Sequence, residues 1–336
     1  MSIEASLETI VGGNRLSVDK FAHLFDHMIS GNMPDTQIAQ ALQALETLGI
    51  SEMELHIGAR ALRDKMLPIQ APTGAMDIVG TGGDGLSTYN ISTACCFVVA
   101  GAGVPVAKHG NRAVSSKSGA SDVLRELGVK LDISPEQTRK CIFEANVGFL
   151  FAPNHHKAMG AVAKARAQLG TRTLFNRLGP LCNPANVEYL LLGVFEDSLR
   201  GIYAKALAQL GAKRALIVHG GDGMDEITTT APTMISELNQ GVITEYEITP
   251  EQFGFSRARL KDIEGGEPQE NARALQSVLD GETGPYCDIV VLNSGAALYA
   301  SGKAETIEDG INRARTSIKT GKAKATLKAL IKVSNG

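Results

Sequence analysis

A glycine-rich stretch at residues 77–93 gives the clearest indication in this sequence of a ligand-binding site. Four glycines lie close together in it: Gly80, Gly82, Gly83 and Gly85. Because glycine has no Cβ, such a segment can turn tightly and bring its backbone close to a ligand. The apolar residues 94–102 are predicted to form a helix capped by Asn90, Ser92 or Thr93, whose first N–H groups would face an anion. We therefore expect a phosphate-binding loop between a strand and a helix.

The spacing of these glycines, G-x-G-x-x-G, also matches the dinucleotide-binding fingerprint. That fingerprint requires an acidic residue about 20 positions further on, to bind the ribose hydroxyls. The corresponding region, residues 104–111, offers Lys108 instead. Asp84 lies inside the loop, where its carboxylate would repel a pyrophosphate unless a cation lay between them. The pattern favours a metal-chelated diphosphate, and an ordinary glycine-rich turn is the alternative.

A second stretch, residues 105–122, follows a predicted buried strand and is dense in phosphate donors. It contains two lysines, one arginine, four serines and two glycines. Lysine, hydroxyl and backbone N–H groups all bind phosphate oxygens. A phosphate cradle is favoured over a solvated loop, because Gly110 and Gly119 lie beside these donors.

A third stretch, residues 220–226, places Asp225 and Glu226 after a glycine turn at a predicted strand end. Adjacent carboxylates in this position are typical ligands of Mg²⁺, which bridges to substrate phosphates. They are poor candidates for a glycosidase pair, since neighbours in sequence seldom flank a bond from opposite sides. The alternative is simple surface charge.

A fourth stretch, residues 151–184, offers positive charge or hydrogen bonds to a second, smaller anion. The groups concerned are His156, Lys157, Lys164 and Arg166. His155 and His156 are also candidate metal ligands, but no Cys, His or carboxylate set at zinc spacing accompanies them.

The elements that must position these groups fall into two parts. Residues 1–70 predict four short amphipathic helices, and the proline-containing residues 66–75 predict a linker. From Met76 onward, short apolar runs alternate with helical segments, which predicts an α/β sheet whose strand ends collect ligands. The predicted strands are residues 77–79, 104–107, 148–151, 188–195, 215–219 and 288–292.

Composition narrows the classes of partner. Of the 336 residues, 43% are hydrophobic and 21% charged, with a net charge of −3, which gives no general reason to expect a nucleic-acid or membrane partner. The basic residues 313–332 carry an apolar stripe, which favours a helix docked on the protein over a nucleic-acid arm. Five cysteines without C-x-x-C spacing, and a first segment unlike a signal peptide, predict a cytoplasmic protein.

Together, these stretches resemble the anthranilate phosphoribosyltransferases of tryptophan biosynthesis over almost the whole chain. The matching motifs are GTGGDG at residues 80–85, NIST at 90–93, KHGNR at 108–112, KSG at 117–119, FNRLGPLCNP at 175–184 and DE at 225–226. The segments QIA at residues 37–39 and LLGV at 191–194 are also similar to that family.

The resemblance implies a fold and a reaction. It implies a homodimer, with a helical domain at residues 1–70 that later helices join. Residues 71–336 would form an α/β domain with a central mixed sheet. The reaction would move the 5-phosphoribosyl group of phosphoribosyl diphosphate (PRPP) to the amino group of anthranilate, with Mg²⁺ and without a protein nucleophile. Lys108, His109 and Arg166 would act through charge and positioning.

The resemblance also implies three sets of contacts. The residues facing PRPP would be Gly80, Gly82, Gly83, Asp84, Thr88, Asn90, Ile91, Ser92, Thr93, Lys108, Asn111, Ser116, Lys117, Ser118, Gly119 and Ala120. Those facing anthranilate would be Gly80, His109, Asn111, His156, Arg166 and Gly179. Magnesium would be held by Ser92, Asp225 and Glu226.

Two positions depart from the family pattern, and two alternative functions remain. Ala120 replaces a serine that often donates to the sugar phosphate, and Lys157 replaces a proline common after His156. A pyrimidine nucleoside phosphorylase would share the architecture, but phosphorolysis does not need the paired carboxylates Asp225 and Glu226. A non-catalytic nucleic-acid-binding relative, using the basic C-terminal helix, is the alternative from another class.

Overall fold

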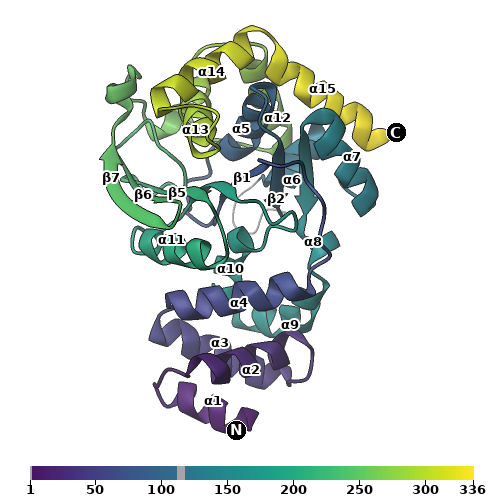
Figure 1. Ribbon diagram of the computed structural model, residues 1–336, viewed down its shortest axis with the longest axis vertical. Helices are drawn as coiled ribbons and strands as arrows, with labels where there is room; N and C mark the ends of the chain where they lie inside the picture. The colour runs from purple at the N-terminus through teal and green to yellow at the C-terminus, as the bar shows by residue number, and fades with distance from the viewer. Residues whose placement is uncertain (1, 112–117) are drawn as a thin grey trace.

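A seven-stranded mixed sheet forms the centre of the larger part of the molecule (Figure 1). The computed structural model describes residues 2–111 and 118–336, so the predicted contacts of Ser116 and Lys117 lie outside the described residues. The strands are β1 Met76–Gly80, β2 Val106–Gly110, β3 Val147–Phe151, β4 Tyr189–Gly193, β5 Arg214–Gly220, β6 Thr233–Asn239 and β7 Val242–Ile248. Their order is β3-β2-β1-β4-β5-β6-β7. The first five strands of that order pair in parallel. β6 pairs antiparallel with β5, and β7 pairs antiparallel with β6, which confirms the mixed sheet.

Four helices stack at the N-terminal end of the molecule, away from the sheet (Figure 1). They are α1 Ile3–Val11, α2 Val18–Ile29, α3 Asp35–Leu48 and α4 Glu52–Lys65. Their boundaries follow local signals in the sequence. At the start of α4, for example, the Glu54 carboxylate accepts a hydrogen bond of 2.7 Å from the Ser51 N–H, as in a capping box. The helical prediction for this segment is confirmed.

Later helices return to this bundle. They are α9 Gly160–Leu169, α10 Leu174–Leu178 and α11 Leu199–Gln209, whereas the short helix α8 Ala152–His155 packs against β3. α9 packs against α2 and α3, and the Phe175 ring of α10 stacks on Phe25 of α2 at 5.3 Å between centroids. One apolar core runs from the bundle through these helices to one face of the sheet. A domain boundary at residue 70 therefore remains a prediction.

The opposite face of the sheet is covered by α5 Ile91–Gly101 and by the C-terminal helices (Figure 1). The remaining helices are α6 Ala120–Glu126, α7 Pro135–Ala145, α12 Pro268–Leu279, α13 Pro285–Ala300, α14 Ile307–Lys319 and α15 Lys322–Asn335. Short 3₁₀ turns complete the described part of the chain: η1 Lys157–Met159, η2 Gly179–Leu181, η3 Pro250–Phe253 and η4 Leu260–Asp262.

The strand expected at residues 288–292 is wrong, because this segment lies inside α13. The helix is buried nearly all round, so its sequence is apolar throughout and shows no helical stripe. A short apolar run of this kind has the same appearance in a buried strand and in a buried helix. The hairpin of β6 and β7 was not predicted.

The basic C-terminal segment forms two docked helices, which break at Gly321 with its φ of 72°. Ile318, Leu327 and Leu330 are buried against the rest of the protein, as the apolar stripe predicted. Within the described residues, no helix combines the length and hydropathy needed to cross a bilayer.

Candidate active site

The carboxyl ends of β1, β2 and β5 bring three of the predicted stretches together. The glycine loop follows β1, Lys108 and His109 lie near the end of β2, and Asp225 and Glu226 lie in the loop after β5. Polar groups at the carboxyl ends of parallel strands share one edge of the sheet, where ligands of open α/β folds collect. The structure therefore builds a single site from segments that lie far apart in the sequence.

Asp225 packs directly against the glycine loop. Its carboxylate accepts a hydrogen bond of 2.6 Å from the Gly82 N–H. A Cβ placed on Gly80 would overlap this carboxylate, and one placed on Gly193, the neighbour of Gly80 on β4, would overlap the Asp225 carbonyl oxygen. Glycine at these two positions thus makes room for the carboxylate loop.

Three carboxylates converge here: Asp84, Asp225 and Glu226. Burial raises the pKa of Asp225 well above its usual value, and the negative charges of Asp84 and Glu226 raise it further. Burial also raises the pKa of Glu226, to about 7, although Ser92 donates hydrogen bonds to this carboxylate from its N–H and its hydroxyl. Like charges held together at a helix N-terminus form a site that a divalent cation would stabilise.

The hard oxygen donors at this point suit magnesium. Ser92, Asp225 and Glu226 offer a hydroxyl and two carboxylates, and Mg²⁺ typically takes one or two protein carboxylates and completes its shell with water and substrate phosphates. Among residues 2–111 and 118–336, no group of three or more His, Cys, Asp or Glu side chains is arranged to hold a metal by itself. The donor set therefore fits a cation that binds together with a phosphorylated substrate.

The loop that carries Asp225 and Glu226 is held in place by hydrogen bonds to α13 and within the loop. Asn293, fully buried on α13, accepts a 2.9 Å hydrogen bond from the Ile227 N–H and donates one of 2.7 Å to the Ile227 carbonyl. Asp222 accepts hydrogen bonds from the Met224 N–H and from the Thr228 hydroxyl. Glu226 is thus held on a backbone that is hydrogen-bonded on both sides.

Lys108 and His109 point to opposite faces of β2, as successive strand residues do. The buried Lys108 ammonium donates a 2.6 Å hydrogen bond to the Ile78 carbonyl. Its positive charge also acts on Glu226 and on Asp77, in each case opposing the effect of burial on the carboxyl pKa. Lys108 thus serves the carboxylate side of the site.

His109 forms a buried pair with His156 on the other face. The Nδ1 of His109 lies 3.1 Å from the Gly179 carbonyl oxygen, and its Nε2 lies 3.2 Å from the Nε2 of His156. Burial, together with the neighbouring histidine, lowers the pKa of His109 to about 3. The pKa of His156 falls to about 4, mainly through burial and then through His155. Both rings are therefore neutral at pH 7.

Arg166 lies on α9 and faces the short helix α10. Its guanidinium is 5.7 Å from the centroid of the Phe175 ring, and one of its nitrogens is 3.5 Å from the Asn176 side-chain oxygen. Burial lowers the pKa of Arg166, but an arginine remains cationic at neutral pH. Since Gly179 directly follows α10, this short helix connects the surroundings of Arg166 and His109.

Asn90 links the glycine loop to the donor-rich loop. It occupies the N-cap position of α5 without the expected capping bond, because its side chain bonds elsewhere. Its amide nitrogen donates to the Ser118 carbonyl at 3.2 Å, and its oxygen accepts a 3.0 Å hydrogen bond from Asn271 of α12. Asn90 therefore holds two loops in one position.

The remaining predicted contact residues lie on the same edge. Thr88 forms a bridge to Glu264, Asn111 is exposed, and Gly119 and Ala120 begin α6. Thr93, Ser118 and Ile91 are buried. The Ile91 N–H donates to the Tyr89 carbonyl, so Ile91 contributes by fixing the start of α5.

Several supporting residues were not assigned a role from the sequence. Asp77 is fully buried in β1, where burial raises its pKa to about 6 and Asn183 donates a 2.7 Å hydrogen bond to it. A carboxylate inside an apolar strand is a signal that would have identified it. No local signal marks Arg172, which donates to the Gly83 carbonyl, or Asn271 and Asn293, which act from helices far along the chain.

Comparison with known proteins agrees with this geometry. Residues 72–324 match the model of a glycosyl transferase family a/b domain, and residues 5–66 match the helical bundle domain of a glycosyl transferase family. Among curated relatives, the anthranilate phosphoribosyltransferase of Bradyrhizobium sp. strain BTAi1 is 48% identical over 333 residues, covering 98% of this chain and 99% of the relative. That of Rhodopseudomonas palustris strain BisB18 is 49% identical over 323 residues, covering 96% and 95%.

Solved structures give the same result. The chain is similar to the anthranilate phosphoribosyltransferase of Thermus thermophilus, with a TM-score of 0.93, 39% identity and coverage of 98% of this chain and 99% of that one. It is also similar to the Saccharomyces cerevisiae enzyme in complex with PRPP and Mg, with a TM-score of 0.92, 28% identity and coverage of 99% and 98%. With both of its parts matched, and the carboxylate cluster and glycine loop in place, the chain belongs to the anthranilate phosphoribosyltransferase family.

Proposed function

We propose that the protein transfers the 5-phosphoribosyl group of PRPP to the amino group of anthranilate and releases diphosphate. The observation that carries this proposal is the set of carboxylates Asp84, Asp225 and Glu226 against the glycine loop, with Lys108 beside it. An anionic cluster beside phosphate donors suits a diphosphate bound together with a cation. The neutral histidine pair and Arg166, beyond the other face of β2, suit an aromatic carboxylate.

The bond changes follow from this arrangement. The C1–O bond of PRPP breaks and its electron pair leaves with diphosphate, while the lone pair of the anthranilate amine forms the new C1–N bond and the amine loses a proton. The glycine-loop N–H groups and Lys108 hold the phosphates, and Arg166 holds the anthranilate carboxylate. When bound by Ser92, Asp225 and Glu226, magnesium supplies positive charge to the diphosphate. Catalysis is thus mainly positioning and electrostatic stabilisation.

The neutral state of His109 and His156 contributes to this mechanism. C1 gains positive charge as the leaving group departs, and a cationic imidazolium beside it would raise the barrier. Burial keeps the pKa of both rings well below 7, so the histidine pair itself adds polarity without charge. Arg166 then contributes the cation that fixes the orientation of the carboxylate.

We also infer that the protein is a homodimer. A groove of about 600 Å³ between α1 and α3 is largely apolar, and Leu7, Ala44 and Leu48 contribute to its lining. Val11, which also lines it, is 59% exposed. A second copy of the same surface would cover these side chains in a two-fold contact. All five cysteines are free thiols, which supports a place in the reducing cytoplasm.

The reaction is tested by following anthranilate fluorescence after addition of PRPP and Mg²⁺. We expect the fluorescence to fall with time in the complete mixture and to stay constant without Mg²⁺. The alternative, a pyrimidine nucleoside phosphorylase, is tested in parallel with thymidine and inorganic phosphate. Release of thymine there, with no loss of anthranilate fluorescence, would refute the proposal.

Replacing Arg166 with alanine separates the two substrates. Charged hydrogen bonds contribute about 1.5–3 kcal/mol, so we expect Arg166→Ala to raise the KM for anthranilate roughly 10- to 100-fold. The KM for PRPP should change much less. Lys164→Ala is the matched control, because Lys164 lies on the same helix but is 75% exposed and pairs with Asp35. Equal effects on both KM values would contradict the assignment of Arg166.

The raised carboxyl pKa values predict how magnesium dependence varies with pH. The carboxylates must be ionised to bind Mg²⁺, and the pKa of Glu226 is about 7. Protons therefore compete with the cation below pH 7, and the Mg²⁺ concentration for half-maximal activity should be roughly tenfold higher at pH 6 than at pH 8.

Glu226→Gln isolates this effect from the titration of the substrate phosphates. The variant should require more Mg²⁺ at pH 8 and show a smaller difference between the two pH values. Glu247→Gln, at an exposed position on β7, is the control and should behave as the original protein. An unchanged pH dependence in Glu226→Gln would exclude Glu226 as the titrating ligand.

The dimer is tested by placing a charge on the α1–α3 surface. Val11→Asp should give a 35.5 kDa monomer in light scattering, because the carboxylate would be buried in the contact without a partner. Val242→Asp, at a position 63% exposed on β7, should leave the dimer intact. If light scattering showed the unsubstituted protein to be a monomer, the homodimer would be refuted.

A further inference from the structure

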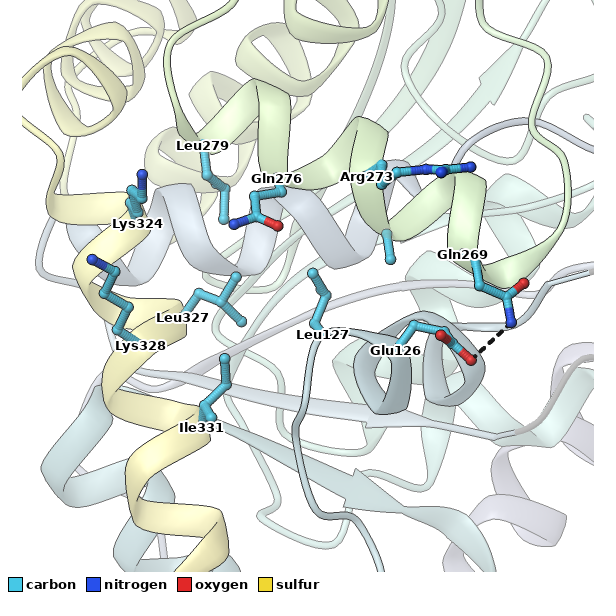
Figure 2. A pocket seen from close by; sticks show the side chains of 11 residues that line it. Glu126, Leu127, Gln269, Arg273, Gln276, Leu279, Lys324, Leu327, Lys328 and Ile331 are labelled. Atoms are coloured by element: carbon cyan, nitrogen blue, oxygen red, sulfur yellow. Dashed lines mark hydrogen bonds between the residues drawn. The ribbon is translucent and has the colours of Figure 1, made fainter.

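A groove on the outer side of the α/β part lies between α6, α12 and α15 (Figure 2). Its volume is about 440 Å³, within the range of small-molecule sites. Apolar side chains from α12, α15 and the end of α6 form its floor: Leu127, Ala272, Leu279, Leu327 and Ile331. Figure 2 shows polar and charged side chains around them, which include Arg273, Gln276, Lys324 and Lys328.

The charge at the rim of this groove is mostly positive. Arg273, Lys324 and Lys328 contribute cations, and Glu126 is the one carboxylate among the described residues of the lining, where Gln269 donates a 3.1 Å hydrogen bond to it. Lys324 pairs with Asp280 outside the groove. Within the part of the chain that the structure describes, Arg273 and Lys328 form no ion pair, so both are available to an anion.

Two of the helices that line the groove, α12 and α6, are connected to Asn90 of the active site by hydrogen bonds. α12 carries Asn271, whose side-chain amide donates the 3.0 Å hydrogen bond to Asn90. α6 begins at Ala120, shortly after Ser118, whose carbonyl accepts the hydrogen bond from Asn90. The Gln269–Glu126 hydrogen bond joins the same two helices at the rim (Figure 2). A change in the spacing of α6 and α12 would therefore act on both sides of Asn90.

We propose that this groove binds a small anion with a short apolar body, either a carboxylate or a phosphate monoester, and that its occupancy changes the affinity for PRPP. The apolar floor takes the body, and the anionic head takes the cation at the end of the groove that it reaches, Lys328 of α15 or Arg273 of α12, which Figure 2 shows at opposite ends. The effect on PRPP rests on the proposed transferase activity, whereas binding at the groove does not.

Binding is measured by calorimetry with hexyl phosphate and heptanoate as probes. Hexanol lacks the charge and inorganic phosphate lacks the apolar body, so both should bind at least tenfold more weakly than the better probe. The double variant R273A/K328A should weaken probe binding at least tenfold. Lys332→Ala is the control, since it removes a lysine of α15 that does not line the groove. Thermal unfolding verifies that each variant is folded, which is expected because Arg273 and Lys328 are exposed.

The effect on the active site is measured as the KM for PRPP with and without the better probe. We expect a change of at least twofold in the original protein and in Lys332→Ala, and no change in R273A/K328A. A change that persists in the double variant would show that the probe competes at the active site, and this would overturn the proposal. So would probe binding that is the same in the double variant and in the control.

A nucleic acid is the competing occupant of a basic surface. Binding of a short duplex DNA that falls steeply with salt and is lost in R273A/K328A, without binding of either probe, would also overturn the proposal. Absence of transferase activity with intact, groove-dependent probe binding would instead refute the proposed function and leave the groove as a binding site.

Discussion

Repulsion among Asp84, Asp225 and Glu226 is the interaction on which the rest of the active site depends. Separate segments hold these three carboxyl groups together at one edge of the sheet, where burial raises the pKa of two of them. Such a cluster costs free energy that the fold must supply through other contacts. Hydrogen bonds from Gly82, Ser92 and Asn293 to the carboxylates or their loop contribute to this, as does the charge of Lys108. In the function proposed above, these contacts would hold the carboxylates in place before a cation and a phosphorylated ligand bind.

The alternation of side chains along β2 divides the site in two. Lys108 faces the layer of α5 and α13, together with the carboxylates, whereas His109 faces the layer that continues into the helical bundle. The carboxylate cluster and the neutral histidine pair are therefore reached from two successive residues of one strand. In the proposed reaction, this separation would let a charged diphosphate and an aromatic acceptor lie on different sides of the same carbon.

Local patterns were sufficient to predict much of this protein from its sequence. Of the four helices in residues 1–70, α1, α2 and α3 end at or next to a glycine, and α1, α2 and α4 follow a serine. The strands that carry the site are short apolar runs followed by glycine or polar residues. The motifs at residues 80–93 and 225–226 identified the chemistry. Local patterns failed where burial removed the contrast, as in α13, and where the partner is distant in sequence. Asn271 and Asn293 reach Asn90 and Ile227 from helices that only the tertiary fold brings near.

Gly193 illustrates how steric constraints extend beyond the groups that touch substrates. It lies on β4, and any side chain there would collide with the backbone of Asp225. In a map of mutational tolerance, this position would resemble an active-site residue although it offers no functional group. Substitutions of Gly193 would be poorly tolerated because β4 must leave space for the backbone of Asp225. That space allows the loop of Asp225 and Glu226 to pack against the glycine loop after β1.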